Sequence, residues 1–131
     1  MIIRLDFVMK FTYNFRMELK TINLKEVALS AEDAGIICKM EIEQAELEGL
    51  NAIKFIHGYG SHGVGGAKLI EVRKICKWLE SHKKIEFFIA GYDWNTQNPK
   101  ALNILLNNKN YFNDVDLNHS NPGITIVKLK N

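Results

Sequence analysis

Apolar and polar residues alternate with two different periods along the chain, and these periods separate predicted strands from predicted helices. Between residues 2 and 24, β-forming residues alternate with polar ones, which predicts one or two strands with one solvent-exposed face. Apolar residues then recur at helical spacing from Ser30, a predicted N-cap, to Gly49, a predicted C-cap, and again over residues 67–82. Short apolar runs predict three more strands, at residues 52–57, 85–90 and 124–129.

The predicted order β, α, β, α, β, β implies a two-layer α/β sandwich. Right-handed crossovers place both long helices on one face of the sheet. The loop after residue 56 then lies at the carboxyl end of a strand and faces a helix amino terminus, where open α/β sheets commonly bind ligands. We expect residues 1–131 to form a single domain, with an N-terminal strand extension at residues 1–20 and a long loop with a short helix at residues 91–121.

That loop belongs to the stretch FIHGYGSHGVGG, residues 55–66, which holds five of the nine glycines. Glycine permits positive φ and lets a ligand approach backbone amides, and the helix amino end adds partial positive charge. The stretch therefore predicts an anion pocket for phosphate, and the alternative is that the glycines only permit a tight turn. The residues predicted to contact the phosphate are His57, Gly58, Gly60, His62, Gly63 and Lys68.

Other phosphate-binding motifs fit the sequence poorly. The P-loop pattern GxxxxGK[ST] is absent from the loop, and GYGSHG lies in the second βα unit, whereas the dinucleotide fingerprint opens the first.

The helix after the loop carries a second candidate feature. Arg73, Lys74 and Lys77 are three and four residues apart, so they share a helix face and extend from Lys68 as a basic ridge. A ridge next to a phosphate pocket suits a nucleic-acid backbone, either DNA or RNA, and the alternative is a solvated helix face. The net charge of +2, from 17 basic and 15 acidic residues, gives no global evidence for such a partner.

The polar segment 91–121 supplies an alternative chemistry. Asp114, Asp116 and His119, joined by Asp93, could place carboxylates and an imidazole around a divalent metal. The alternative is a polar loop closed by Asx turns, with no cofactor. Tyr92 and Trp94 of the same segment either stack on unpaired bases or pin the segment to the body of the domain.

The remaining composition restricts the compartment. Cys38 and Cys76 lie in helical apolar patterns, which favours buried reduced thiols. No apolar run has the length of a membrane span, and charged residues interrupt the first 15 residues, so that a secretory signal is not predicted. We therefore expect a cytoplasmic protein without a membrane partner, and the sequence leaves the oligomeric state open.

From about Thr21 to Leu129 the chain resembles the Smr (small MutS-related) domain. IHGYG at residues 56–60 is similar to the family's IHGxG, and the ending PGITIVKL at residues 122–129 is similar to its glycine followed by TVVxL. The helix that carries Leu69, Val72 and Trp78 also fits. The resemblance implies a βαβαββ fold similar to the carboxy-terminal domain of bacterial translation initiation factor three. It also implies DNA or RNA binding, with nicking endonuclease activity in many members and variable dependence on metal.

The chain departs from the family where the first core strand ends. A DLHG-type motif is usual there, whereas this chain has Asn23-Leu24-Lys25-Glu26. Asparagine is no general base and lysine is ordinarily protonated at neutral pH. The sequence therefore leaves cleavage open: Lys25 is predicted to bind phosphate, and His57 is the candidate acid/base. The alternatives are a nuclease rebuilt around the aspartates of segment 91–121, and a protein-interaction module that kept the fold but lost nucleic-acid cleavage.

Overall fold

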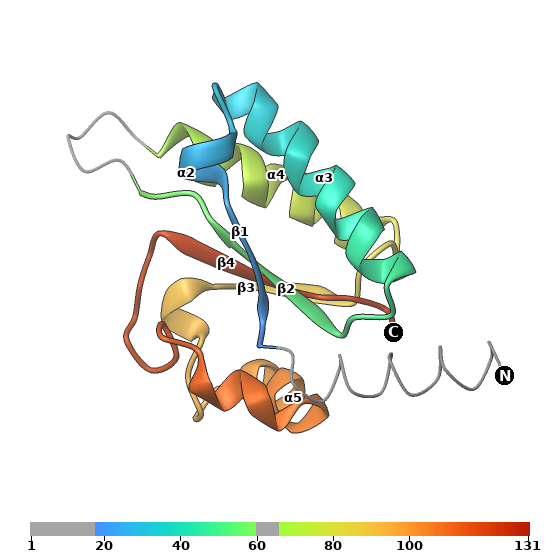
Figure 1. Ribbon diagram of the computed structural model, residues 1–131, viewed down its shortest axis with the longest axis vertical. Coiled ribbons are helices and arrows are strands. Elements are labelled where there is room, and N and C mark those ends of the chain that lie inside the picture. Colours follow the sequence, from blue (N-terminus) through green and yellow to red (C-terminus); the bar gives the residue numbers. More distant parts are fainter. Residues whose placement is uncertain (1–17, 60–65) are drawn as a thin grey trace, which may run out of the picture.

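A mixed sheet lies at the centre of the computed structural model, which describes residues 18–59 and 66–131 (Figure 1). Its four strands, as far as these residues show, have the order β1-β2-β4-β3. β1 (Lys20–Asn23) pairs in parallel with β2 (Ala52–Ile56). β4 (Ile124–Lys128) lies antiparallel between β2 and β3 (Phe87–Ala90). β1 and β3 are therefore the edge strands of the sheet as described.

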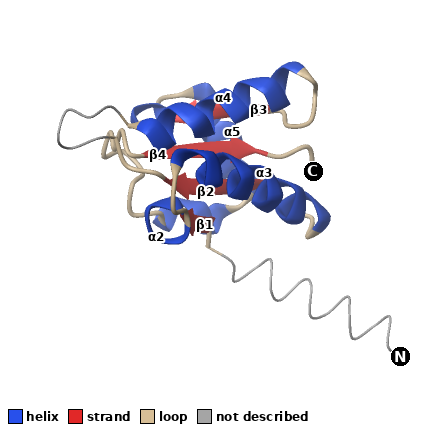
Figure 2. Cartoon of the chain, turned by 90° about the horizontal axis from the view of Figure 1, so that it is seen from above, coloured by secondary structure: helices blue, strands red, loops and turns tan. Residues whose placement is uncertain are grey.

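Two long helices cover one face of this sheet, as the right-handed crossovers predict (Figures 1 and 2). α3 (Ala31–Leu47) begins after Ser30, whose Oγ accepts a hydrogen bond from the amide of Asp33 at 3.1 Å. Gly49 follows the helix with φ of +78°, a conformation that glycine adopts without strain. α4 (Ala67–Ser81) packs beside α3, and both helices bury apolar side chains against the sheet. The predicted α/β fold with both long helices on one face of the sheet is confirmed.

The segment after β3 covers the opposite face of the sheet (Figure 1). It contains the 3-10 turn η1 (Gly91–Asp93), the helix α5 (Pro99–Asn107) and the 3-10 turn η2 (Lys109–Asn113). Asn98 caps α5 by accepting hydrogen bonds from the amides of Lys100 and Ala101, so the predicted short helix is confirmed. The predicted alternation of residues 2–17 lies outside the described residues, and the assignment of residues 1–131 to one domain stays a prediction.

A buried ion pair attaches this segment to β2. Lys54 is only 2% exposed, and its ammonium donates to both carboxylate oxygens of Asp114, at 2.9 and 3.1 Å, and also contacts Asp116. Trp94 Nε1 donates to Asp114 Oδ2 at 2.9 Å, and Asn121 Nδ2 donates to Asp116 Oδ1 at 2.9 Å. Buried charges are stable when they are paired and hydrogen-bonded, so this cluster fixes the segment in one position.

Candidate nucleic-acid interface

Three connections meet at one end of the sheet: the loop after β2, η1 after β3, and the turn before β4. The amides of His57 and Gly58 both donate to the carbonyl oxygen of Gly123, at 2.9 and 3.1 Å. Gly58 has φ of +75°, which explains why glycine stands there. Because the two amides are already paired, they do not support the predicted backbone pocket for phosphate. Gly60, His62 and Gly63 lie outside the described residues, and their predicted contacts stay predictions.

His57 lies in the interior, with 4% of its surface exposed. Its Nδ1 is 2.7 Å from the carbonyl oxygen of Gly58, and its Nε2 is 2.8 Å from the hydroxyl oxygen of Thr125. A carbonyl only accepts, so Nδ1 carries the proton and Nε2 accepts from the Thr125 hydroxyl. Burial, with a smaller contribution from the charge of Arg73, lowers the pKa of His57 to about 4, against a raising effect of the Gly58 carbonyl.

His57 is consequently neutral at neutral pH, and both of its ring nitrogens are occupied. In this arrangement the ring does not reach a phosphate or a substrate proton. The acid/base role predicted for His57 stays a prediction, and the described geometry does not support it.

Arg73 extends the same polar chain to α4. Its Nε donates to the Thr125 hydroxyl at 3.4 Å, while its Nη2 is buried and has no hydrogen-bond partner among the residues described. A buried guanidinium nitrogen without an acceptor is costly, and an anion that reaches it removes the cost. Arg73 is therefore the described residue that most directly indicates an anion site.

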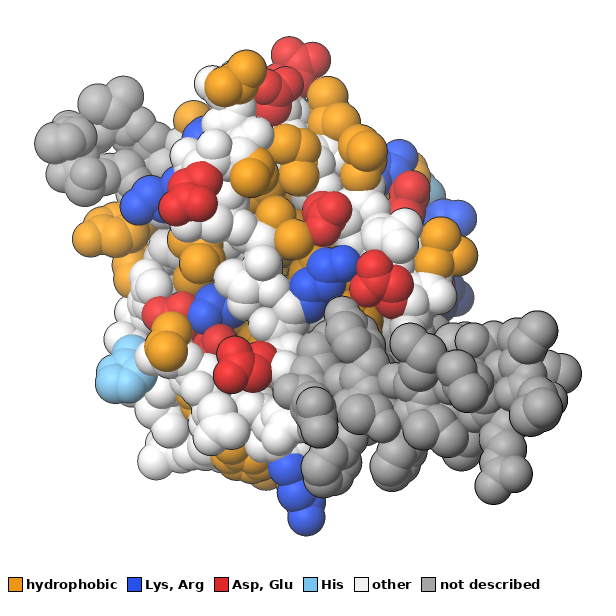
Figure 3. All heavy atoms as spheres, viewed as in Figure 1, with side chains coloured by type: hydrophobic (Ala, Val, Ile, Leu, Met, Phe, Trp, Pro, Cys, Tyr) orange, Lys and Arg blue, Asp and Glu red, His pale blue; other side chains and the backbone are white. Residues whose placement is uncertain are grey.

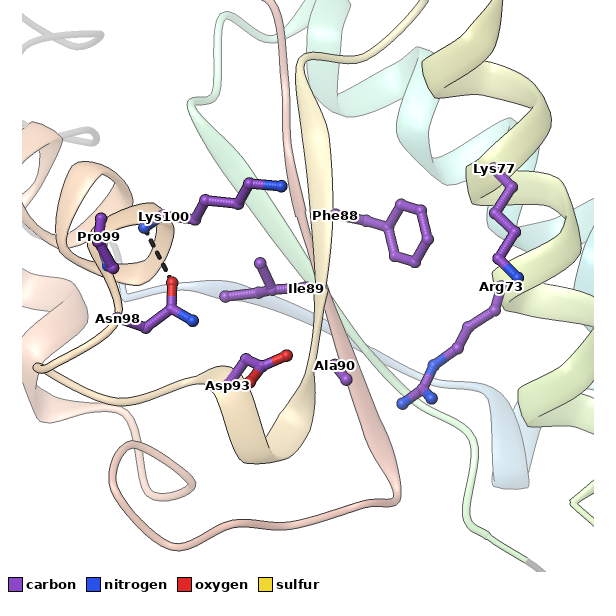
Figure 4. Close-up of a pocket in the computed structure, with 9 residues that line it drawn as sticks. All are labelled: Arg73, Lys77, Phe88, Ile89, Ala90, Asp93, Asn98, Pro99 and Lys100. Carbon is purple, nitrogen blue, oxygen red and sulfur yellow. Dashed lines mark hydrogen bonds between the residues drawn. The ribbon is translucent and has the colours of Figure 1, made fainter.

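A groove of about 630 Å³ opens beside Arg73 (Figure 4). Lys77, one helical turn further along α4, lines the same side of the groove. Lys100 and Asn98 line the side formed by α5, and Phe88, Ile89 and Ala90 of β3 lie between the two sides. Three cationic side chains and one carboxylate, that of Asp93, make the lining positive.

The charges elsewhere are mixed. In the coloured part of the face over α3, basic side chains are interleaved with acidic ones (Figure 3). The net charge of +2 is thus not spread evenly as a basic surface, and local clustering decides where an anion binds.

The four basic residues of the predicted ridge differ in their contacts and exposure. The ammonium of Lys68 is directed toward α2, where it donates to the carbonyl oxygens of Leu24 and Ala28, at 3.3 and 2.9 Å. It thereby holds the carboxyl end of the short helix α2 (Leu24–Val27). Its role as a phosphate ligand stays a prediction, which this geometry does not support. Lys74 and Lys77 are exposed on α4.

Lys25 approaches the glycine loop from the other side. A Cβ built on Gly58 would lie 3.5 Å from Cδ of Lys25, so the lysine side chain passes over this glycine. Its neighbour Asn23 caps α2 by accepting a hydrogen bond from the amide of Lys25 at 3.1 Å. The position where the family carries an aspartate therefore holds a helix cap in this chain.

The predicted metal ligands are not gathered into a metal site. The carboxylates of Asp114 and Asp116 both form ion pairs with the ammonium of Lys54, and His119 is exposed. Across residues 18–59 and 66–131, no group of three or more His, Cys, Asp or Glu side chains could hold a metal ion. The two aspartates are structural, which corrects the metal hypothesis that joined them to Asp93 and His119.

The remaining candidates divide between structure and surface. Trp94 is fully buried and pins segment 91–121 to the body, whereas Tyr92 remains exposed. Cys38 and Cys76 are buried free thiols, as predicted. Sequence reasoning missed Thr125 and Lys100: a lone threonine in an apolar strand and a lysine in a short helix carry no signal of their own.

Comparison with known proteins identifies the fold. No family model and no curated protein matches the chain. Within the described part of the chain, no helix combines the length and the apolar character that crossing a membrane requires. The crystal structure of the Smr domain of Thermus thermophilus MutS2 superposes with a TM-score of 0.52 at 20% sequence identity, covering 86% of this chain and 100% of that one.

At this level of identity the likeness shows the fold alone. The similarity to translation initiation factor three stays a prediction. The four-stranded sheet, the two helices on one face and the matched structure together give this chain an Smr-like α/β fold.

Proposed function

We propose that the chain binds nucleic acid through the phosphate backbone. The contacts in this proposal are Arg73, Lys74 and Lys77 along α4, and Lys25 beside the glycine loop. The observation that carries the proposal is the buried Nη2 of Arg73, which has no partner within the described residues and belongs to the same helix as the exposed Lys74 and Lys77. The resemblance of the sequence to the Smr domain implies the same class of partner, and the Smr-like fold agrees with that resemblance.

The charges favour contacts that position a strand rather than read its sequence. Lysine is a flexible point charge, and phosphate contacts carry no sequence information. We therefore expect binding that depends little on base sequence and strongly on salt. On duplex DNA, log K is expected to fall with log salt at a slope of about 0.9 for each phosphate neutralised.

Fluorescence anisotropy with labelled duplex and single-stranded oligonucleotides tests the proposal. The double variant Lys25→Glu, Lys74→Glu is expected to weaken binding to both, whatever the sequence, and to lower the salt slope by about one for each lost contact. Lys109→Glu is the matched control for the single variants Lys25→Glu and Lys74→Glu, because Lys109 is exposed just beyond the carboxyl end of α5, away from α4. Equal affinity of the double variant and the control would remove this surface from the proposed function.

We do not extend the proposal to nicking, because the described residues of the predicted cleavage site do not support it. His57 is buried and neutral, and Asn23 is a helix cap. The protein-interaction alternative has support of its own, since no strand of residues 18–59 and 66–131 pairs with the outer edge of β3.

A further inference from the structure

The outer edge of β3 is an unpaired strand edge. β3 pairs with β4 on one side, and none of the described strands pairs with its other side. In Figure 4, β3 lies in front of β4, and no other strand is drawn in front of β3. An edge strand presents N–H and C=O groups that can pair with another extended chain.

The groove follows this edge. Its floor consists of three consecutive residues of β3, Phe88, Ile89 and Ala90. Phe88 points to the α4 side and Ile89 points to the α5 side, as expected for neighbouring residues of a strand (Figure 4). A groove that spans both faces of one strand fits an extended chain, whose own side chains also alternate between two faces.

Positive charge flanks the edge on both sides. Arg73 and Lys77 stand on the α4 side, and Lys100 stands on the α5 side. None of the three forms a salt bridge with a carboxylate of the described residues. Lys100 instead lies with its ammonium 5.5 Å from the centre of the Phe87 ring. Acidic side chains on alternate faces of an added strand would therefore meet a cation on each side.

We propose that the open edge of β3 binds an extended acidic peptide, which adds to the sheet as a strand beside β3. Main-chain hydrogen bonds to the edge supply affinity, and the cations on the two sides select acidic side chains. A nucleic-acid strand offers phosphates to these cations, but it has no N–H and C=O groups with the spacing of a β-strand. This is why the groove favours a peptide over a second nucleic-acid contact.

The probe is a short fluorescent peptide of Val-Val-Glu-Glu repeats, which places glutamates on both faces of a strand, measured by anisotropy against the full chain. We expect saturable binding of this peptide and none of its valine–lysine counterpart. A version with N-methylated backbone amides keeps the charge but removes the donors. It is expected to bind at least about tenfold more weakly, because two lost hydrogen bonds suffice for that factor.

Lys100→Glu tests the same groove from the side of the protein. Lys100 is exposed and belongs to the groove alone, whereas Lys25 and Lys74 belong only to the proposed nucleic-acid surface. We expect Lys100→Glu to weaken peptide binding by about tenfold, as one lost cation contact of roughly 1.4 kcal/mol implies, and to leave nucleic-acid affinity unchanged. Lys109→Glu should change neither.

Three results would overturn the proposal. If the valine–glutamate peptide does not bind, the edge is not a peptide site, whatever the nucleic-acid assays show. Equal affinity of the N-methylated peptide would mean that charge alone attracts it, without strand addition. Weakened binding of single-stranded DNA, together with unchanged peptide binding, in Lys100→Glu would assign the groove to nucleic acid instead.

Discussion

Lys54→Met removes the ammonium that Asp114 and Asp116 share while keeping a side chain of similar length. Loss of one partner of a buried ion pair typically costs about 3–5 kcal/mol, because the other charge stays buried and uncompensated. The side chain of Asp114 is 8% exposed and that of Asp116 is 17% exposed, so water partly compensates the second carboxylate. We therefore expect a loss near the lower limit, about 3 kcal/mol of unfolding free energy.

Urea unfolding followed by circular dichroism measures this loss. For a domain with a stability of about 5–15 kcal/mol, the expected change is a large fraction of the total. The triple variant Lys54→Met, Asp114→Asn, Asp116→Asn removes the stranded charges and keeps an acceptor for Trp94 Nε1. It should recover at least half of the loss, since neutral replacement of a buried ion pair costs far less than breaking one.

The pH dependence separates this explanation from simple loss of packing. Burial alone would raise the pKa of Asp116, but hydrogen bonds from Lys54 and Asn121 bring it below its ordinary value. A carboxyl with a lowered pKa stabilises the fold above its unfolded pKa, about 3.9, and loses that contribution as the pH falls through the folded value. Lys54→Met should lose this dependence. A cost below about 1 kcal/mol, or no recovery in the triple variant, would contradict the assigned role of the cluster.

Three further predictions concern positions that can be tested singly. The pKa of His57 is lowered from 6.5 to about 4, so between these pH values only the unfolded chain takes up the proton. The free energy of unfolding should therefore fall by up to about 3 kcal/mol as the pH drops from about 6.5 to about 4. Urea melts of His57→Gln should lack this pH dependence. Gly91→Ala should destabilise the fold by more than about 2 kcal/mol in thermal melts, because the added Cβ would overlap the carbonyl oxygen of Asn121. Gly49→Ala is the control: its Cβ meets no atom within 4 Å, and its positive φ should cost only about 1 kcal/mol. Lys68→Met should lower stability by about 1 kcal/mol through the lost bonds to α2 and leave nucleic-acid affinity unchanged; the reverse pattern in melts and anisotropy would restore Lys68 to the ridge.

Local signals sufficed for the long helices. Ser30 before the apolar period and Gly49 after it predict α3 to within about two residues, because a cap and a left-handed glycine act on their immediate neighbours. The crossover rule then places α3 and α4 on one face, since it depends only on the order of the elements. These features involve residues that are close in sequence, so the sequence predicts them.

The candidate site depends on contacts between distant parts of the chain, and there the sequence was a poor guide. Glycine in the loop after β2 correctly indicates a backbone with positive φ, at Gly58. The first two amides of this loop, however, donate to the carbonyl oxygen of Gly123, next to the last strand. Likewise, the aspartates of segment 91–121 have a spacing in the sequence that suits metal ligands. In the structure, Asp114 and Asp116 pair instead with Lys54, which lies in the middle of an apolar strand. A lysine in such a run is the one signal that a buried carboxylate exists elsewhere, because an unpaired buried charge is too costly.

The end of β1 decides between binding and cleavage. General acid–base catalysis needs a group that exchanges protons near neutral pH and reaches the substrate. The side-chain oxygen of Asn23 accepts a hydrogen bond as the N-cap of α2, and the side chain of Lys25 passes over Gly58. His57 is buried and has a pKa of about 4. At the end of β1 the described residues thus place a cation, Lys25, but neither Asn23 nor His57 acts as an accessible base there. We therefore expect supercoiled plasmid to stay intact, with and without Mg²⁺, at protein concentrations that give a complete gel shift. Any conversion to open circles would contradict this reasoning, and its loss in His57→Gln would assign the base to His57.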